Sequence, residues 1–419
     1  MGVCLLLLAA QCQVAFADGL IRDGIGAISI GRGGTNQGFA DNGAILHDNP
    51  AAMVNIGPRS FFDVSIDTLA CDLHYTDADP NDASGFVRPL PLPEVAFIRR
   101  SEDGDFAWGI GAFVPAGFSA SYNMTNPIVG PEPYKAIGGL CKLLPGAAYR
   151  LTDNLSIGGT IGLALSHAEL EGPWTIQSGP LAGVPTIMDL QATGVAPTGS
   201  IGLQYQATER TTLGVCYSTE SRFILDGNMK AQVFGFGPPL SSQFDAELDL
   251  VWPRSLSLGV KHDLCDCQRV SADVIWFDWS HAFNQMDLTL TNSTNPVFPL
   301  LVGPTIKDVY PLGWRDTVSL RLGYEWDQTC CDTWRLGYVY HDSPVPDATL
   351  TPYLDGVLEH AFSVGYTRHG SRAMLNLAYQ YSFGPERNVG QSDLVGGDFS
   401  NSTFSAQAHW ACIGLLVPF

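Results

Sequence analysis

FSAQAHWACIGLLVPF, residues 404–419, is the stretch that decides the fold. Ile413, Leu415, Val417 and Phe419 occupy alternate positions in it, and alternate side chains of an extended strand lie on one face. That face is entirely apolar and ends in an aromatic residue, as expected of a strand whose outer side contacts lipid. A final core strand of a soluble protein would alternate in the same way, so the rest of the chain has to separate the two folds.

The same period of two recurs inside the chain. Leu256, Leu258 and Val260 alternate with small or polar residues, which indicates a strand with one apolar face. A sandwich and a barrel both produce this pattern. Further segments of this kind are 318–324, 361–367 and 375–381.

The strand count and the connections favour a barrel. Short connections such as 101–105 alternate with long ones, 115–139, 291–313 and 385–403. Outer-membrane barrels have an even number of strands, short turns on one side and long loops on the other, and a sheet in lipid must close because unpaired backbone groups are too costly there. The sequence therefore predicts an all-β, 14-stranded antiparallel transmembrane β-barrel, a multi-pass protein of the cell outer membrane. The predicted strands are 59–74, 93–100, 106–114, 140–151, 155–169, 189–207, 211–228, 243–262, 268–290, 314–326, 334–342, 360–368, 372–384 and 404–419.

Residues 1–17 have features of a signal peptide. The apolar run 3–10 is too short to span a membrane as a helix, and Ala15-Phe16-Ala17 reads as a cleavage site. No Lys or Arg precedes Arg22, so the usual basic leader is missing. Export remains the better interpretation.

Residues 18–58 are rich in glycine and do not show the pattern of a strand. Glycine permits close approach of backbones, and Asn49-Pro50 favours a turn. The segment is either a flexible leader or an N-terminal hatch, a plug that fills the lumen of a barrel made by residues 59–419. We predict the hatch.

Charge and cysteine content exclude several functions. The net charge of −20 and the pI of about 4.6 argue against nucleic-acid partners, which need clustered Lys and Arg. No metal-ligand spacing is recognisable among the ten cysteines, so we expect neither a metal site nor a cofactor. Cys265-Asp266-Cys267 and Cys330-Cys331 fall in predicted turns, and Cys265 with Cys267 could form a local disulfide in an exported chain.

A family resemblance rests on segments spread along the chain. They are Gly31-Arg32-Gly33-Gly34, Asp41-Asn42-Gly43-Ala44, Asp48-Asn49-Pro50-Ala51-Ala52-Met53, Trp252-Pro253-Arg254-Ser255, Trp314-Arg315-Asp316 and Tyr340-His341-Asp342-Ser343-Pro344. In this order they resemble the FadL family of outer-membrane transporters for long-chain fatty acids and hydrocarbons. The aromatic C-terminal strand likewise resembles the assembly signal of outer-membrane barrels.

The resemblance implies passive diffusion of hydrophobic small molecules through a hatched barrel with a lateral opening. In the family, the hatch motif, here Asn49-Pro50-Ala51, lies against an inward kink of the third strand. The corresponding positions are Gly109, Gly111, Pro115 and Gly117, because glycine and proline mark bends and bulges in strands. Alternatively, these glycines only make room for the hatch.

The resemblance also implies ligand capture by two outer loops, here 170–188 and 229–242. Exposed apolar patches often bind ligands, but the two loops could equally pack together as a lid. An anionic cargo would require basic groups in the lumen, and the scarcity of lysine leaves this role to arginine and favours neutral hydrocarbons. The candidate capture residues are Leu181, Ile187, Met188, Phe234, Phe236 and Leu240.

Three rival functions remain. A barrel enzyme of the lipase or protease type is disfavoured because no G-x-S-x-G motif occurs, and because adjacent His-Asp pairs such as His47-Asp48 would point to opposite faces of a strand. A general porin would have a polar constriction and no hatch, and an adhesin would bind no ligand in its lumen. We therefore predict a non-enzymatic monomer whose partners are a hydrophobic small molecule, outer-membrane lipid and lipopolysaccharide.

Overall fold

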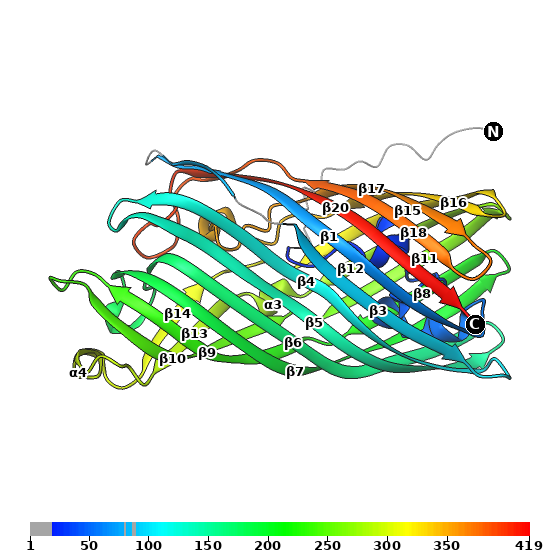
Figure 1. The fold of residues 1–419 in the computed structure, drawn as a ribbon, viewed down its shortest axis with the longest axis horizontal. Coiled ribbons are helices and arrows are strands. Elements are labelled where there is room, and N and C mark those ends of the chain that lie inside the picture. The colour runs from blue at the N-terminus through cyan, green and yellow to red at the C-terminus, as the bar shows by residue number, and fades with distance from the viewer. Residues whose placement is uncertain (1–18, 79–80, 86–88) are drawn as a thin grey trace, which may run out of the picture.

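The computed structural model describes residues 19–78, 81–85 and 89–419, so the predicted signal peptide 1–17 lies outside it. Its strands form one closed sheet (Figure 1). The first strand, β1 (Ser60–Thr76), pairs antiparallel with the last, β20 (Ser402–Pro418), from Phe61↔Pro418 to Thr76↔Thr403. This pairing closes the barrel and leaves no free edge between the two ends of the sheet.

The wall is a 14-stranded antiparallel barrel, as predicted. Several barrel strands consist of two segments in series, because β8 and β9 both pair with β7, and β10 and β11 continue them on the next strand. The remaining strand segments are β2 (Asp82–Ser84), β3 (Leu90–Arg100), β4 (Phe106–Asn126), β5 (Gly130–Thr152), β6 (Leu155–Thr175), β7 (Pro185–Thr208), β8 (Thr211–Ser218), β9 (Ser221–Val233), β10 (Leu240–Trp252), β11 (Ser255–Cys265), β12 (Gln268–Phe277), β13 (Gln285–Thr291), β14 (Ile306–Pro311), β15 (Thr317–Thr329), β16 (Asp332–Tyr340), β17 (His360–His369), β18 (Met374–Phe383) and β19 (Arg387–Val389).

The predicted apolar face points outward. Ile413, Leu415 and Phe419 are exposed on the outer surface, and so are Leu256 and Leu258 of β11. The inward-facing neighbours on β11 are small or polar, and on β20 the inward-facing Leu416 packs in a buried cluster, which suits a sheet that has lipid on one side and a filled lumen on the other.

No helix in the described part of the chain is long and apolar enough to cross a membrane.

The two ends of the barrel differ in the length of their connections. The short-turn end carries the connections 101–105, 209–210, 266–267, 330–331 and 370–373 together with Phe419. The opposite, long-connection end carries 176–184, 234–239, 292–305, 341–359 and 384–401, with the helices η2 (Gly179–Leu181), α4 (Val297–Val302) and η3 (Asp347–Thr349).

The prediction of three long loops was partly wrong. Residues 115–139 are not a loop, because β4 and β5 continue through them to the turn 127–129. Residues 291–313 contain α4 and β14, and 385–403 contain β19. Pro115 and Gly117 misled the prediction, since strand-breaking residues are tolerated where one edge of the strand is unpaired.

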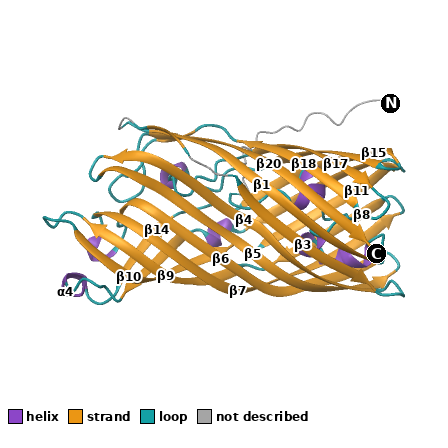
Figure 2. Cartoon of the chain, viewed as in Figure 1, coloured by secondary structure: helices purple, strands orange, loops and turns teal. Residues whose placement is uncertain are grey.

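The N-terminal segment, residues 19–58, lies inside the barrel. Its helices α1 (Gly26–Gly31), α2 (Ile45–Asp48) and η1 (Pro50–Asn55) are enclosed by the wall (Figure 2). Helix α1 packs against β17 and β18, whereas η1 packs against β5, β6 and β7. The segment therefore bridges separate sides of the lumen in its short-turn half.

Candidate transport path inside the barrel

Polar contacts fix the N-terminal segment to the wall. Arg32 donates from Nη1 to Glu325 Oε1 of β15 at 2.6 Å, and the Arg32 side chain is fully buried. On the neighbouring β12, Asp273 Oδ2 accepts from the backbone N–H groups of Asn36 and Gln37 at 2.7 and 3.1 Å. Buried polar groups must be paired in this way, so these contacts set the position of the segment.

Glycines, which have no side chain, allow the N-terminal segment to approach the wall closely. Gly33 has φ +68°, a conformation that L side chains rarely adopt, and a Cβ on Gly337 of β16 would lie 2.0 Å from the Gly33 nitrogen. A Cβ on Gly31 would lie 2.8 Å from the Cα of Gly365 on β17. The segment and the wall therefore meet backbone to backbone.

The Asn49-Pro50-Ala51 motif caps η1 and touches the wall at β6 and β7. Asn49 is fully buried, its Oδ1 accepts from the Ala51 N–H at 3.2 Å, and its Nδ2 donates to the carbonyl of Leu203 on β7 at 3.1 Å. Ser156 of β6 donates to the Ala51 carbonyl at 2.9 Å. The resemblance implied a contact with the kinked third strand, but the structure seats this motif on β6 and β7.

Strand β4 has an irregularity between Phe113 and Ala116, which we call the kink. The β4–β5 register shifts between Phe113 and Ala116, and the β3–β4 pairing ends at Val95↔Ala112. From Phe113 onward, no described wall strand pairs with the β4 edge that faces β3, and this edge is contacted by β2 only near its far end, where the Thr125 N–H donates to Asn81 Oδ1. Of the predicted residues, Pro115 and Gly117 lie on this open edge.

Gly109 and Gly111 lie before the kink, where β4 still pairs with β3. A Cβ on Gly109 would lie 3.1 Å from the side chain of Leu46 in the N-terminal segment. For Gly109, the structure thus matches the alternative that glycine makes room for this segment.

Residues 20–22 of the N-terminal segment occupy part of the open edge. Ile21 forms an antiparallel bridge with Ala116, Arg22 N–H donates to the Pro115 carbonyl at 3.0 Å, and Gly117 N–H donates to the Leu20 carbonyl at 3.0 Å. This short strand addition covers the gap in the wall from inside.

Arg22 anchors this strand addition. Its guanidinium donates to Glu94 Oε1 of β3 at 2.6 Å and to the Val114 carbonyl at 2.9 Å, and it also pairs with Asp67 of β1. Burial disfavours the charged form, but the two carboxylates outweigh burial and raise the pKa of Arg22 above its ordinary value. The sequence analysis missed this group of three charged side chains, here called the clamp, whose signal was the acidic residues Asp67 and Glu94 at inward positions of β1 and β3.

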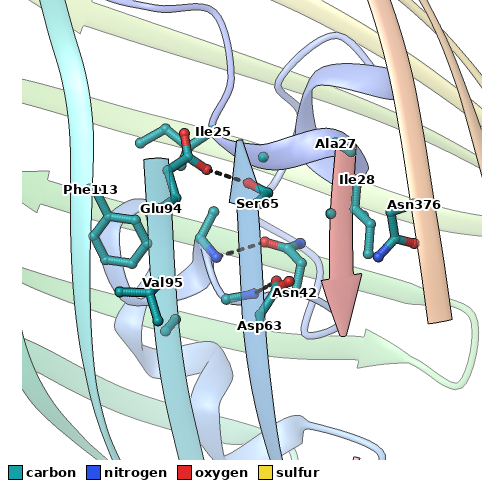
Figure 3. A pocket seen from close by; sticks show the side chains of 15 residues that line it. Ile25, Ala27, Ile28, Asn42, Asp63, Ser65, Glu94, Val95, Phe113 and Asn376 are labelled. Atoms are coloured by element: carbon teal, nitrogen blue, oxygen red, sulfur yellow. Dashed lines mark hydrogen bonds between the residues drawn. The ribbon is translucent and has the colours of Figure 1, made fainter. Parts of the chain in front are cut away.

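Little space remains beside the clamp. A cavity of about 20 Å³ lies between the segment and strands β1 and β3, lined by Ile25, Ile28 and Phe113 and by the polar Asp63 and Glu94 (Figure 3). About 10–15 Å³ of such volume holds one water molecule, so this space admits no cargo. The N-terminal segment seals this side of the lumen.

The half of the lumen toward the long-connection end is apolar and aromatic. The Trp279 and Trp314 rings lie 4.9 Å apart, and the Trp174 and Tyr310 rings 4.3 Å apart. The connection 341–359 folds into this cluster and contributes further buried side chains, namely Val345, Leu350, Tyr353, Leu354 and Val357.

The predicted capture residues do not form one group. Ile187 and Met188 line an open groove of about 640 Å³ beside Asp189 and Lys230. Leu181 is buried in the luminal cluster, Phe236 is exposed at a hairpin tip, and Phe234 and Leu240 are half-buried beside it. The expected loops were too long, because strands β6, β7, β9 and β10 extend into 170–188 and 229–242 and leave only 176–184 and 234–239 as connections.

One buried cation in the wall stands out. Lys142 of β5 faces the lumen opposite Phe113, directly at the kink, and in the described part of the chain no carboxylate forms an ion pair with it. By contrast, Arg22 and Arg32 are both paired with acids. No group of three or more His, Cys, Asp or Glu residues in the described ranges is arranged to hold a metal ion.

The chain resembles known proteins in sequence and in fold. The profile of the family described as outer membrane protein transport protein (OMPP1/FadL/TodX) matches residues 8–415. No curated protein matches the chain in sequence. Among solved structures, a Pseudomonas aeruginosa FadL homologue has a TM-score of 0.77 at 19% identity, covering 96% of this chain and 100% of that one. The P. putida toluene transporter TodX gives 0.78 at 21%, with 95% and 99% covered, and the Ralstonia pickettii toluene transporter TbuX gives 0.76 at 21%, with the same coverage.

Proposed function

The chain belongs to the OMPP1/FadL/TodX family of outer-membrane transport proteins, and from this we propose that its cargo is a small uncharged hydrocarbon. The protein is thus an outer-membrane β-barrel of a family that transports hydrophobic substrates. By the convention of such barrels, the short-turn end faces the periplasm and the long-connection end faces outside.

The observation that carries the proposal is the apolar, aromatic lining of the outer half of the lumen. A water-filled pore offers a hydrocarbon no favourable environment, whereas contact with apolar side chains gains about 25 cal/mol per Å² removed from water. TodX and TbuX are toluene transporters by name, and an aromatic lining suits a cargo of this chemistry.

The charges in the lumen favour a neutral cargo. The buried Arg22 and Arg32 are each held by carboxylates of this chain, so neither is available to a carboxylate ligand without breaking a buried ion pair. A fatty acid is the second candidate, and Lys142 is the observation that favours it.

Replacing Lys142 by methionine separates the two cargoes. For a neutral cargo, uptake of labelled toluene into cells carrying the Lys142→Met variant stays within about twofold of the wild type. For an anionic cargo, Lys142→Met lowers uptake of a labelled long-chain fatty acid about tenfold, the effect of losing a charged hydrogen bond of roughly 1.5 kcal/mol. Fatty acid uptake that exceeds toluene uptake and depends on Lys142 would contradict the proposal.

The proposed exit is sideways, through the gap between β3 and β4 at residues 113–117. Support comes from the unpaired β4 edge and from the sealed lumen behind it, where the N-terminal segment acts as the hatch. A hydrocarbon leaving there enters lipid directly and never meets bulk water.

Substitution of Asn49 tests the role of the hatch in transport. Asn49→Ala removes the cap of η1 and the bond to β7, at a cost of about 1 kcal/mol or more, and is expected to change toluene uptake without affecting barrel assembly. Asn154→Ala, in an exposed turn, is the matched control. Deletion of residues 18–58 is the stronger variant, and unchanged uptake in both it and Asn49→Ala would refute the role of the hatch.

A conductance measurement distinguishes a hatched apolar channel from a general porin. A hatched apolar channel passes little ionic current after reconstitution, whereas a porin passes a large and steady one. We also expect the protein to act as a monomer in the lipopolysaccharide-containing membrane, since β1 and β20 pair along their length and residues 20–22 of the same chain cover the β4 edge at 115–117.

An enzymatic role finds little support in the geometry. The sequence argument against His47-Asp48 was wrong in its premise, because the pair lies on helix α2 and the two side chains meet at 2.8 Å. Among the described contacts, however, no serine hydroxyl hydrogen-bonds to His47, and a nucleophile next to the base is what hydrolysis needs. Assays with ester and peptide substrates are expected to give no turnover.

A further inference from the structure

Two pairs of cysteines lie on neighbouring turns at the periplasmic end. Cys265 and Cys267 flank the β11–β12 turn with their Sγ atoms 3.2 Å apart. Cys330 and Cys331 form the β15–β16 turn with their Sγ atoms 3.4 Å apart. Neither pair belongs to the transport path described above.

The two turns are held side by side. Strands β12 and β15 pair directly, with Gln268 opposite Trp326, and the Asp327 N–H donates to the Cys267 carbonyl at 2.8 Å. Cys267 and Cys330 line the same periplasmic cavity of about 590 Å³, and both are exposed. All four sulfurs are thus gathered at one site that periplasmic proteins can reach.

The other four cysteines of the described part of the chain differ in their position. Cys71, Cys141, Cys216 and Cys412 lie within wall strands, and none of them is in contact with another described sulfur. They provide an internal reference for cysteines that remain thiols.

We propose that Cys265–Cys267 and Cys330–Cys331 are two oxidation sites, each closed into a local disulfide in the periplasm. The oxidant is a periplasmic protein that carries a reactive disulfide. One thiolate of the pair attacks this disulfide and forms a mixed disulfide, with release of one thiolate of the oxidant. The second thiolate of the pair then attacks the mixed disulfide, which forms the local bond and leaves the oxidant as a dithiol.

The compartment and the spacing both support local bonds. Disulfides form and persist in the periplasm, and the Cys265 and Cys267 sulfurs, 3.2 Å apart, need only a small rotation to bond. The bond between the adjacent Cys330 and Cys331 closes an eight-membered ring, which is a more strained geometry. Oxidation within each turn leaves no thiol at the rim that could cross-link the barrel to another protein. The inference rests on the outer-membrane location and not on the identity of the cargo.

Peptide mapping tests the proposal directly. Outer membranes are quenched in acid, alkylated under denaturing conditions and digested with trypsin before any reduction. Peptides 262–269 and 322–335 each contain one whole pair, so a local disulfide makes each peptide lighter by two hydrogen atoms and leaves it without alkyl groups. The four wall cysteines should be alkylated in the same sample, and reduction before alkylation should add two alkyl groups to each turn peptide.

Three results would overturn the proposal. Full alkylation of both turn peptides before reduction would show free thiols, and a species in which peptide 262–269 is linked to 322–335 would show bonding between the turns. A normal local disulfide in protein from cells whose periplasm is kept reduced with dithiothreitol would show an artefact of preparation. Cys267→Ser and Cys331→Ser each leave one alkylatable cysteine in their own turn and should leave the other pair oxidised.

Discussion

Arg22 faces two carboxylates, Asp67 and Glu94, at a site where all three side chains are buried. A buried ion pair contributes little net stability as a whole, but removing one partner leaves uncompensated charge and costs about 3–5 kcal/mol. In this protein, loss of Arg22 would destabilise the contact between residues 20–22 and the open edge of β4. At the scale of one residue, therefore, Arg22 determines whether the gap in the wall stays covered.

Arg22→Gln is expected to release residues 20–22 from β4. Hydrogen exchange of the Arg22 and Gly117 amides should speed up, because both donate across this contact, and toluene uptake should rise several-fold. The triple variant Arg22→Leu, Asp67→Asn, Glu94→Gln removes the charges together and should restore slow exchange. Equal exchange rates in the wild type and Arg22→Gln would show that the clamp does not hold the segment.

Gly337 decides how the N-terminal segment seats. Gly337→Ala places a methyl group where the Gly33 nitrogen lies, so residues 31–36 must move away from β16. We expect faster proteolysis of the N-terminal segment and an unchanged heat-modifiable mobility of the barrel on gels. Leu336→Ala, on the lipid-facing side of the same strand, is the control. A segment that resists protease equally in both variants would contradict the close contact.

At the scale of elements, the connection 341–359 closes the outer half of the lumen and should respond to pH. Burial raises the pKa of Asp355 from its ordinary value to about 6. The closed connection therefore binds the proton more tightly than an open one. Closure is most favourable at low pH, weakens as pH rises from the ordinary pKa of this carboxyl to about 6, and changes little above that, because the carboxyl is then ionised in both states.

The measurement for this element is hydrogen exchange of residues 345–358 at pH 5 and pH 7, corrected for the intrinsic rate. Protection should be higher at pH 5, and Asp355→Asn should remove the difference. A pH dependence that survives in Asp355→Asn would assign the effect to another group.

The elements also show what the sequence could and could not reveal. Alternation gave the outward faces of β11 and β20, because the period of two is a local property of the chain, whereas β14 was placed in a predicted loop. Pro115 and Gly117 were read as the end of the strand, although β4 continues through them, since pairing on the β5 side cannot be seen locally. The Asn49-Pro50-Ala51 motif was found, but its seat on β6 and β7 and the role of Arg22 depend on contacts between residues far apart in the chain.

At the scale of the whole molecule, the N-terminal segment occupies the short-turn half of the lumen and an apolar, aromatic cluster occupies the other half. Between the segment and the short turns lies the cavity of about 590 Å³. The open edge of β4 lies between these two halves of the lumen. On the proposed path, cargo that enters from outside reaches the gap before it reaches the periplasm.

The most direct test of this path is photolabelling of outer membranes with a small hydrocarbon that carries a diazirine, followed by mapping of the modified residues. Lipid-facing residues such as Leu258 and Leu320 will be labelled in any case and report that the probe is active. We predict additional labelling of the luminal Trp174 and Leu190 and of the β4 edge at 114–117, all reduced by excess toluene. Labelling confined to the outer surface, with the lumen and the β4 edge untouched, would contradict the path.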